Sequence, residues 1–328
     1  MIEPSMTKRP TCKLSICIAT YNRASFIGAT LDNIISQAHN DCEIVISDNA
    51  STDNTKEVIA SYARRFDRLR YFRHDTNLGL DRNFDSAVDL ARGEYCWLMS
   101  DDDWLKPNAI ARVMAVLAGN LSLVVVNMEL RDFTMSKIVR SRFIDFESDR
   151  NYESGETDRL FVELDNTLWN IGNVIVKRDI WMSRERERYY GSWFIHIGVI
   201  FQDHLPGGAF LISEPLINYR LGNTQSASSV WAEIFLHKWP SLVDSLVLSN
   251  SAKDIIKSTK PWRNLRTMLC LRSDHGYTLA QYKLWISPRL RSFHERLIPI
   301  LVAVTPRPLA NLFITLAGTI RLTPTLSG

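Results

Sequence analysis

Short apolar runs that alternate with stretches of helical periodicity are the feature of this chain that most constrains its fold. In the first half of the chain the runs cover residues 14–19, 43–47, 69–72, 95–99 and 121–127. Helical spacing of apolar residues occupies 25–37, 53–66 and 80–91, and a further helix is expected to open at Pro107. Strands that alternate with helices over short connections predict a parallel sheet with helices on both faces. The sequence therefore predicts an α/β fold.

Polar segments follow four of the predicted strands, at the point where each strand ends. These segments cover residues 20–23, 48–53, 74–79 and 100–103. The carboxyl ends of parallel strands lie at one edge of a sheet, and ligands bind beyond that edge near the switch point of the strand order. We therefore expect the four segments to converge on one crevice.

Three consecutive aspartates, Asp101, Asp102 and Asp103, follow the fourth predicted strand. Neighbouring carboxylates repel one another and are stabilised when a hard divalent cation lies among them. An exposed loop that caps the helix at Pro107 is the simpler alternative. The cation interpretation is favoured by Asp48, because this carboxylate ends an apolar strand and is expected to face the same crevice.

Four short segments follow one another along the chain: IATYNR, SDNASTDNT, NLG and WLMSDDDWLKP. In the order and the spacing of these segments the chain resembles the family-2 glycosyltransferases. The resemblance covers residues 13–127 strongly and 168–229 loosely. It implies the GT-A fold, a Rossmann-like, mostly parallel sheet flanked by helices, and a transferase that uses a nucleotide-diphosphate sugar. The DNAST segment and the aromatic helical tail look most similar to bacterial O-antigen transferases of lipopolysaccharide biosynthesis, including the abequosyltransferase-like group.

The resemblance also implies a nucleotide-sugar site, residue by residue. In that site Thr20, Tyr21 and Asn22 would frame the base and the ribose, and Asp48 would hydrogen-bond the base. Apart from the resemblance, Asn77 and Arg82 offer donors suited to phosphate or sugar hydroxyls, with a simple turn as the alternative for Asn77. Arg220 would pair with the diphosphate, with a structural ion pair as the alternative. The full predicted set is Thr20, Tyr21, Asn22, Asp48, Asn77, Arg82, Asp101, Asp102 and Arg220.

The metal ligands are the point at which this chain departs from the family pattern. Family members commonly read Asp-x-Asp-Asp before Trp-Leu-x-Pro, and with Trp104 and Pro107 aligned the first Asp falls at Met99. The ligand would be Asp101 by alignment, or Asp101 with Asp103 by spacing. The implied cofactor is Mg²⁺ or Mn²⁺, which would neutralise charge on the leaving diphosphate.

The catalytic base is not evident, because the Glu-Asp pair that usually supplies it is absent from the second half. The corresponding stretch, GSWFIHIGVIFQDH, offers His196 and Asp203. A neutral imidazole accepts a proton, although a lone histidine in an apolar helix is commonly a core residue. A route without a dedicated base stays open, and with it the stereochemistry. Trp169 and Asn173 are the expected acceptor-binding residues.

The chain is expected to divide into a transferase domain over residues 1–225 and a helical region over 226–328. Within the second, residues 297–320 are strongly apolar and flanked by arginines. Prolines interrupt this stretch at three positions, Pro299, Pro306 and Pro308. A crossing helix needs about 20 apolar residues, so we expect two short amphipathic pieces on a membrane surface. Packing on the core and a true span are the alternatives.

Composition limits the partners and the compartment. The net charge of +3 is too small to predict a nucleic-acid partner. Five scattered cysteines without a CxxC pair favour a reducing, cytosolic setting, and residues 1–13 lack the apolar region of a signal peptide. The resemblance implies a lipid-linked (polyprenyl-diphosphate) oligosaccharide acceptor. Together with the basic, apolar C-terminal stretch, it leads us to expect a peripheral location on the inner face of the cytoplasmic membrane.

Two other functions fit parts of the same pattern. A nucleotidyltransferase shares the parallel sheet and the acidic metal site, but TYNRAS after the first strand is not the Gly-rich basic loop that it would need. A non-catalytic nucleotide- or sugar-binding module of the same fold is the alternative of a different class. Measurable sugar transfer would distinguish the enzyme from that module.

Overall fold

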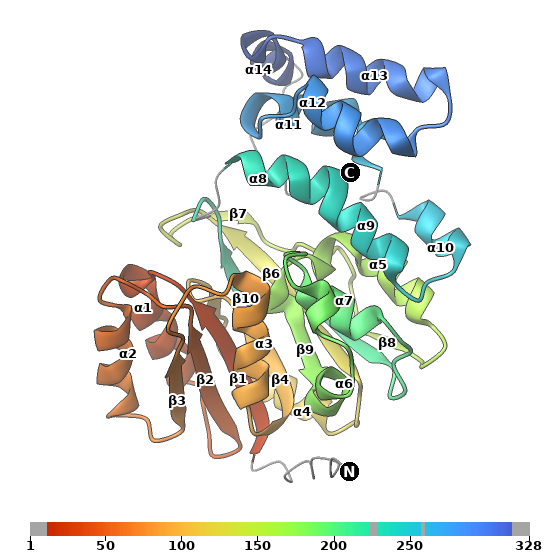
Figure 1. Cartoon of the computed structure of the whole chain (residues 1–328). Coiled ribbons are helices and arrows are strands. Elements are labelled where there is room, and N and C mark those ends of the chain that lie inside the picture. The colour runs from red at the N-terminus through yellow and green to blue at the C-terminus, as the bar shows by residue number, and fades with distance from the viewer. Residues whose placement is uncertain (1–11, 224–227, 257–259, 317–328) are drawn as a thin grey trace, which may run out of the picture. The chain divides into compact units, whose positions relative to one another are not determined.

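The computed structural model describes residues 12–223, 228–256 and 260–316, and these fall into two compact units (Figure 1). The first unit contains the described residues of Met1–Thr157, Thr167–Gly191 and Ile195–Leu221. The second contains those of Asp158–Asn166, Ser192–Phe194 and Gly222–Gly328. The predicted domain boundary, between residues 225 and 226, lies outside the described residues.

A ten-stranded sheet forms the centre of the first unit. Its main path runs β3-β2-β1-β4-β9-β6-β10-β5, with β7 paired to β6 and β8 paired to β10. The strands are β1 (Cys12–Thr20), β2 (Cys42–Asp48), β3 (Leu69–Arg73), β4 (Gly93–Met99), β5 (Trp104–Leu105), β6 (Leu123–Arg131), β7 (Ile138–Arg140), β8 (Arg150–Tyr152), β9 (Val174–Lys177) and β10 (Ala209–Arg220).

The strands of the first half pair in parallel, as the strand–helix alternation predicts. Parallel ladders join β1 to β2, β1 to β4 and β2 to β3, and a further parallel ladder joins β6 to β10. Strand β9 enters antiparallel between β4 and β6. The predicted α/β architecture with a mostly parallel sheet is therefore confirmed, and β5, β7, β8 and β9 join it by antiparallel pairing.

Helices cover both faces of this sheet because the strands are apolar on both sides. On one face Leu14, Ile16 and Ile18 of β1 pack in the same core cluster as Ile27 and Leu31 of α1. Helix α3 contacts β1 and β2 on the other face (Figure 1). The helices of the first half are α1 (Ala24–Ile35), α2 (Thr55–Ala63), α3 (Leu80–Leu90) and α4 (Ala109–Leu117).

Shorter helices connect the later strands. They are α5 (Thr157–Leu168), a 3₁₀ turn at Ile171–Asn173, α6 (Arg178–Met182), a 3₁₀ turn at Glu187–Tyr189 and α7 (Ile195–Phe201). Every residue of α7 is buried. Its Gly198 lies directly against Tyr189, because a Cβ built on this glycine would lie 2.2 Å from the tyrosine ring.

The second unit is helical, which confirms the predicted C-terminal architecture. It also includes two segments from earlier in the chain, Asp158–Asn166 and Ser192–Phe194. Phe161 of the first stacks on Trp239 with ring centroids 6.1 Å apart, and Phe194 of the second lies edge-on to the same indole at 4.9 Å. Its helices are α8 (Ser228–Glu233), a π turn at Ile234–Lys238, α9 (Trp239–Ser245), α10 (Asn250–Ile255), a 3₁₀ turn at Pro261–Arg263, α11 (Leu265–Asp274), α12 (Leu279–Gln281), a π turn at Tyr282–Ile286, a 3₁₀ turn at Ser287–Arg289, α13 (Phe293–Val304) and α14 (Arg307–Leu316).

Within the described ranges, no single helix has the length and apolar character needed to cross a membrane. The pair formed by α13 and α14 meets those criteria only when taken together, and it is bent by 109° between the two helices.

Candidate functional site

The carboxyl ends of β1 and β2 lie side by side and carry the first predicted site residues. Thr20 and Asp48 are direct partners in the parallel register, and both side chains are buried. Asn83 of α3 donates from Nδ2 to the carbonyl oxygen of Thr20 at 3.2 Å. Tyr21, next along the chain, is half-buried. The ends of two strands and the first turn of α3 therefore meet at one edge of the sheet.

Hydrogen bonds connect the loops that follow β1, β2 and β3. The backbone N–H of Asn22 donates to Ser51 Oγ at 2.9 Å, and Asn22 Oδ1 accepts from the N–H of Thr52 at 2.7 Å. Asn22 holds a φ of 53°, which asparagine tolerates better than most residues. Asn49 Nδ2 donates to Asn77 Oδ1 at 2.8 Å. The three loops form one connected rim.

Asp48 is fully buried, and its carboxylate is fixed by three neighbours. Oδ1 accepts from the N–H of Ser51 at 2.8 Å, Oδ2 accepts from the Tyr71 hydroxyl at 2.7 Å, and Arg73 Nε lies 3.9 Å from Oδ2. Burial and the bond to Asp48 raise the pKa of Tyr71 well above its usual range, so the phenol donates at neutral pH. Each carboxylate oxygen has a second lone pair, which leaves acceptor capacity for a ligand.

Sequence reasoning missed Tyr71 and Arg73 as parts of this site. Both belong to β3, and the parallel register places Arg73 beside Asp48. The available signal was a polar side chain, Tyr71, inside the strand predicted over 69–72 and a charged one, Arg73, directly after it. It becomes informative only when β3 is known to pair with β2.

The three consecutive aspartates are buried, with Asp103 only 1% exposed. Burial and the charge of Asp102 raise the pKa of Asp101 to about 7, against the opposing effect of Arg23, whose Nε lies 3.3 Å from Asp101 Oδ1. Burial and Asp102 also raise the pKa of Asp103 well above its usual range. The carboxylates therefore lie close enough to disfavour one another's ionisation.

Helix α1 holds this acidic loop in place. Thr30 Oγ1 donates to the carbonyl oxygens of Asp101 and Asp103 at 3.0 and 3.3 Å. The Asn33 side chain makes two hydrogen bonds to the backbone of Leu105: Nδ2 donates to the carbonyl oxygen, and Oδ1 accepts from the N–H. The loop is a fixed part of the fold, which argues against the simpler interpretation of an exposed capping loop.

The carboxylate oxygens of the acidic loop are suitable ligands for a divalent cation that also binds phosphate oxygens of a ligand. Asp103 Oδ1 accepts from the N–H of Arg220 at 2.8 Å, and its buried Oδ2 has no hydrogen-bond partner among the described residues. For Asp103, a raised carboxyl pKa and an unpartnered buried oxygen are what a carboxylate shows when it lacks a positive partner. No cluster of three or more acidic, histidine or cysteine ligands occurs in the described part of the chain. Mg²⁺ bound through one or two carboxylates and substrate phosphates does not require such a cluster.

Arg220 is held by the protein on several sides. Its guanidinium lies over the rings of Phe26 and Trp104, 5.3 and 5.4 Å from their centroids. Nε donates to the carbonyl oxygen of Asp102 at 3.0 Å, and Nη1 donates to that of Phe133 at 2.6 Å. These contacts hold the guanidinium in place, but none of them is the structural ion pair expected as the alternative, and the pairing of Arg220 with a diphosphate stays a prediction.

Asn77 and Arg82 lie at the start of α3. Asn77 Oδ1 also accepts from the N–H of Gly79 at 2.9 Å, and Gly79 has a φ of 87° that favours glycine. Arg82 is exposed, and its guanidinium lies 4.4 Å from the centroid of the Tyr190 ring. Asn77 shapes the turn into α3, and Arg82 extends from its first turn.

The two predicted bases occupy opposite ends of α7 and different environments. His196 is 1% exposed, its Nε2 lies 2.8 Å from the carbonyl oxygen of Leu168, and burial lowers its pKa to about 4. Asp203 is exposed and lies two residues past the end of the helix. At the beginning of α7, Asp81 Oδ1 accepts from the N–H of Ile195 at 3.2 Å. Asp81 is a carboxylate at the ligand edge of the sheet that sequence reasoning missed.

The predicted acceptor residues lie in the segment before β9. Asn173 is fully buried; its Nδ2 donates to the carbonyl oxygen of Thr167 at 3.2 Å, and its Oδ1 accepts from Asn170 Nδ2 at 3.1 Å. Trp169 is half-buried. The hydrogen bonds of Asn173 hold its own loop, and an acceptor-binding role for either residue stays a prediction.

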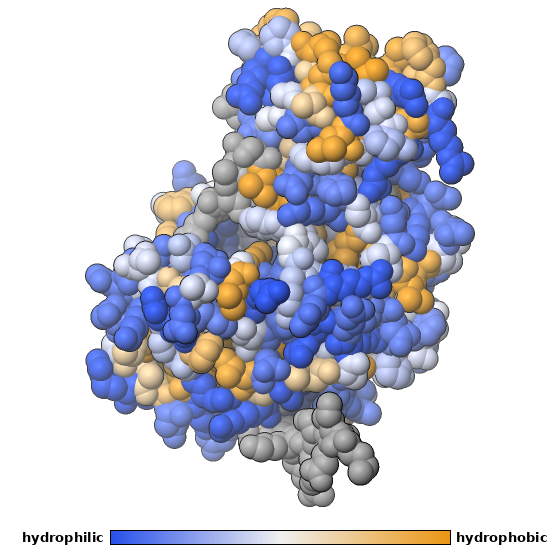
Figure 2. Space-filling model, viewed as in Figure 1, coloured by the Kyte–Doolittle hydropathy of each residue, from blue (hydrophilic) through white to orange (hydrophobic). Residues whose placement is uncertain are grey.

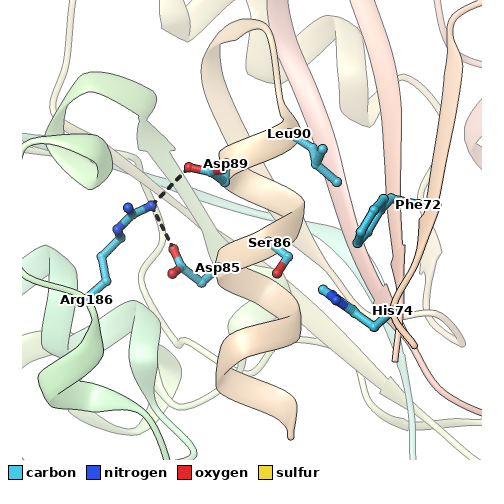
Figure 3. Close-up of a pocket in the computed structure, with 7 residues that line it drawn as sticks. All are labelled: Phe72, His74, Asp85, Ser86, Asp89, Leu90 and Arg186. Atoms are coloured by element: carbon cyan, nitrogen blue, oxygen red, sulfur yellow. Dashed lines mark hydrogen bonds and ion pairs between the residues drawn. The ribbon is translucent and has the colours of Figure 1, made fainter. Parts of the chain in front are cut away.

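A shallow pocket of about 340 Å³ lies beside α3 (Figure 3). Arg186 lies at one side of it and is bonded to Asp85 and Asp89, at 3.2 and 3.3 Å. His74, on the other side of α3 in Figure 3, has its Nε2 3.1 Å from Ser47 Oγ. The lining residues are Phe72, His74, Asp85, Ser86, Asp89, Leu90 and Arg186. None of them belongs to the predicted nucleotide-sugar set.

Comparison with known proteins gives one consistent result. The model of the family described as "Glycosyl transferase family 2" matches residues 15–178. The abequosyltransferase RfbV of Salmonella typhimurium is 32% identical over 231 residues, which are 64% of this chain and 67% of that protein. A Campylobacter jejuni GalNAc(5)-diNAcBac-PP-undecaprenol beta-1,3-glucosyltransferase is 33% identical over 103 residues, 31% of this chain and 33% of that protein.

Solved structures with the same architecture are more distant in sequence. S. aureus TarS 1–349 in complex with UDP-GlcNAc superposes with a TM-score of 0.58 at 13% identity, covering 94% of this chain and 93% of that one. The mannosyltransferase PcManGT from Pyrobaculum calidifontis, in complex with GDP-Man and Mn²⁺, gives a TM-score of 0.54 at 17% identity, covering 97% and 83%. These likenesses support the expected GT-A fold.

Proposed function

The chain belongs to glycosyl transferase family 2, and from this premise we propose that it transfers one sugar from a nucleotide-diphosphate donor to a lipid-linked oligosaccharide. The product would enter an O-antigen or similar cell-surface polysaccharide, built at the inner face of the cytoplasmic membrane. The observation that carries the donor assignment is the edge of the sheet where Thr20 and Asp48 lie as neighbours and a buried acidic loop follows β4. The names of the two relatives, an abequosyltransferase and a glucosyltransferase of an undecaprenol-linked glycan, support this choice.

In this proposal the nucleoside binds beside Asp48. The Tyr71 hydroxyl and the Ser51 N–H hold the carboxylate in one orientation, so that its remaining lone pairs can accept from a donor group of the base. The structures with bound UDP-GlcNAc and GDP-Man support a nucleotide-sugar donor for this fold. Because Asp48 is buried, a hydrogen bond to it is stronger than it would be in water.

Asp101 and Asp103 would hold Mg²⁺ or Mn²⁺ together with the diphosphate oxygens. When bound, such a cation neutralises the charge that develops on the leaving diphosphate. The protein prepares its side of the site with the Arg23 guanidinium beside Asp101 and the Arg220 N–H on Asp103 Oδ1. Both contacts fix carboxylates that would otherwise repel one another.

The proton of the acceptor hydroxyl needs a base, and we propose Asp81 for that role. Its carboxylate lies in the first turn of α3 and reaches the start of α7, at the edge where β1 and β2 end. His196 is buried and its lowered pKa keeps it neutral, but its Nε2 is already directed to a backbone carbonyl. Asp203 follows the seven-residue α7, about 10 Å of helix away from Ile195.

Nucleotide binding is the experiment that tests this function first. We expect one of UDP, GDP, CDP and dTDP to raise the melting temperature with Mn²⁺, and the shift to disappear with a chelator. Ligand at about 100 times its Kd stabilises by about 2.7 kcal/mol. Asp48→Asn should abolish the shift, whereas Asp67→Asn, a change of an exposed aspartate, should leave it intact. The absence of any shift in folded protein would contradict the donor site.

Transfer to a lipid-linked acceptor separates the enzyme from the binding module. Radiolabelled sugar from the nucleotide that binds should appear in the lipid fraction with the wild-type chain. Metal-dependent nucleotide binding without turnover on any lipid-linked acceptor would favour a non-catalytic module.

A further inference from the structure

Helices α13 and α14 each pack one apolar stripe inside the second unit. On α13 the buried residues are Pro299, Val302 and Ala303, which recur at intervals of three and four. On α14 they are Ala310 and Ile314, also four apart. Both helices contact α11. One side of each helix is therefore used for tertiary packing.

A second apolar stripe on the same two helices remains exposed. Figure 2 shows hydrophobic residues gathered over the helices of this unit, at the top of the view. Leu301 is 61% exposed and Phe293 is 72% exposed. We call this set the outer face; it consists of Phe293, Leu297, Ile298, Leu301 and Val304 of α13 and Leu309, Leu312 and Phe313 of α14. Soluble monomers rarely expose this many large apolar side chains on one short segment.

The dimensions of the two helices suit the surface of a bilayer better than its interior. Helix α13 has 12 residues and α14 has 10. At about 1.5 Å per residue they are roughly 18 and 15 Å long, against a hydrocarbon core of about 30 Å. The bend of 109° between them turns the chain instead of extending it. Helices of this kind lie in the interface with their apolar side chains among the lipids.

The charge around the outer face selects an anionic partner. Residues 260–307 contain nine lysines and arginines and two acidic residues. Arg291 precedes α13, Arg307 opens α14, and both are exposed. Anionic headgroups attract such cations. A second copy of this chain, placed face to face, would bring the same positive segment against itself, so self-association through this face is disfavoured.

We propose that the outer face of α13 and α14 docks the protein on an anionic lipid surface, with its apolar side chains inserted at the interface and neither helix crossing the bilayer. The inference deepens the proposed function by naming the surface that brings the enzyme to a lipid-linked acceptor. Vesicle binding requires neither donor nor acceptor. The docking surface and the transferase activity can therefore fail independently.

Vesicle flotation of the full chain tests the docking surface. The protein should float with phosphatidylcholine–phosphatidylglycerol vesicles and much less with phosphatidylcholine alone, and added salt should release it. Leu301→Glu should lower the partition coefficient at least tenfold, because a leucine proposed to insert among the lipids is replaced by a charge. Ile255→Glu is the matched control, because Ile255 of α10 is 59% exposed and lies outside the outer face. It should bind as the wild type does.

Arginine substitutions test how much charge contributes to vesicle binding. Arg291→Gln and Arg307→Gln should each lower binding to the anionic vesicles about fivefold, whereas Arg64→Gln, in an exposed position of the first unit, should not. These residues are exposed, and so is Leu301, so thermal melts of the variants should match the wild type.

Three results would overturn the proposal. In the first, the protein floats with neither kind of vesicle. In the second, it floats equally well with both kinds. In the third, Leu301→Glu floats with the anionic vesicles as well as the wild type does. Sedimentation in the absence of lipid adds a fourth: a dimer that Leu301→Glu dissociates would assign the outer face to self-association.

Discussion

Replacing Asp101 by asparagine should stabilise the ligand-free protein at pH 8 while abolishing sugar transfer. Burial and Asp102 raise the pKa of Asp101 from 3.8 to about 7, with the Arg23 ion pair already opposing that rise. Between these two values the folded chain holds a proton that the unfolded chain releases. The free energy of unfolding of the wild type therefore falls as the pH rises through this window.

The size of the effect follows from the width of that window. Each pKa unit corresponds to about 1.4 kcal/mol, so ionised Asp101 costs about 4 kcal/mol above pH 7 relative to its protonated form. Asparagine has nearly the shape of the protonated acid and does not titrate. The advantage of Asp101→Asn over the wild type should therefore grow by about 3 kcal/mol between pH 5 and pH 8.

Urea unfolding of both proteins at the two pH values, with chelator present, measures this difference. Asp67→Asn serves as the control, because it makes the same substitution at an exposed aspartate outside the buried acidic loop. Mn²⁺ with the cognate nucleotide should stabilise the wild type and leave Asp101→Asn unchanged. A difference between variant and wild type that stays constant with pH would refute the argument from burial, and a variant less stable at pH 8 would refute it more strongly.

Four further substitutions test the packing and the base. Gly198→Ala should destabilise the first unit by about 2 kcal/mol or more in thermal unfolding, because the new methyl would overlap the Tyr189 ring. Gly155→Ala, where the methyl meets open space, should be neutral within about 0.5 kcal/mol. Asp81→Asn should lower kcat by about 100-fold or more in the transfer assay while nucleotide binding persists. His196→Gln should cost about 1 to 3 kcal/mol of stability, and the kcat of its folded fraction should stay within about threefold of the wild type.

The alternation of apolar runs and helical stretches was sufficient to predict the α/β fold. Period and length are local properties, so the strands ending at Thr20 and Asp48 and the helices between them follow from the sequence alone. The loops that follow those strands could also be singled out, because polar residues at the ends of apolar runs have few roles other than capping and ligand binding. The interrupted apolar stretch near the C-terminus predicted short helices for the same local reason.

Contacts between distant residues were beyond the reach of such patterns. The partner of Asp48 is Tyr71, and that follows only from the pairing of β2 with β3. Phe161 and Phe194 belong to the second unit because both pack on Trp239. These outcomes depend on which apolar surfaces cover one another, and a one-dimensional pattern does not specify that.

The site residues differ in the same way: some can be identified from the sequence, and the environment of others is known only from the fold. The sequence by itself determined that Asp48 and the aspartates at 101–103 each lie at the end of a strand, because the apolar runs and the residues that end or follow them can be read along the chain. Only the tertiary structure decided that Arg220 is enclosed by aromatic rings, that His196 is buried and that Asp81 reaches α7. Burial and hydrogen-bond partners set the charge and the orientation of a side chain, and both are supplied by residues far away in the sequence.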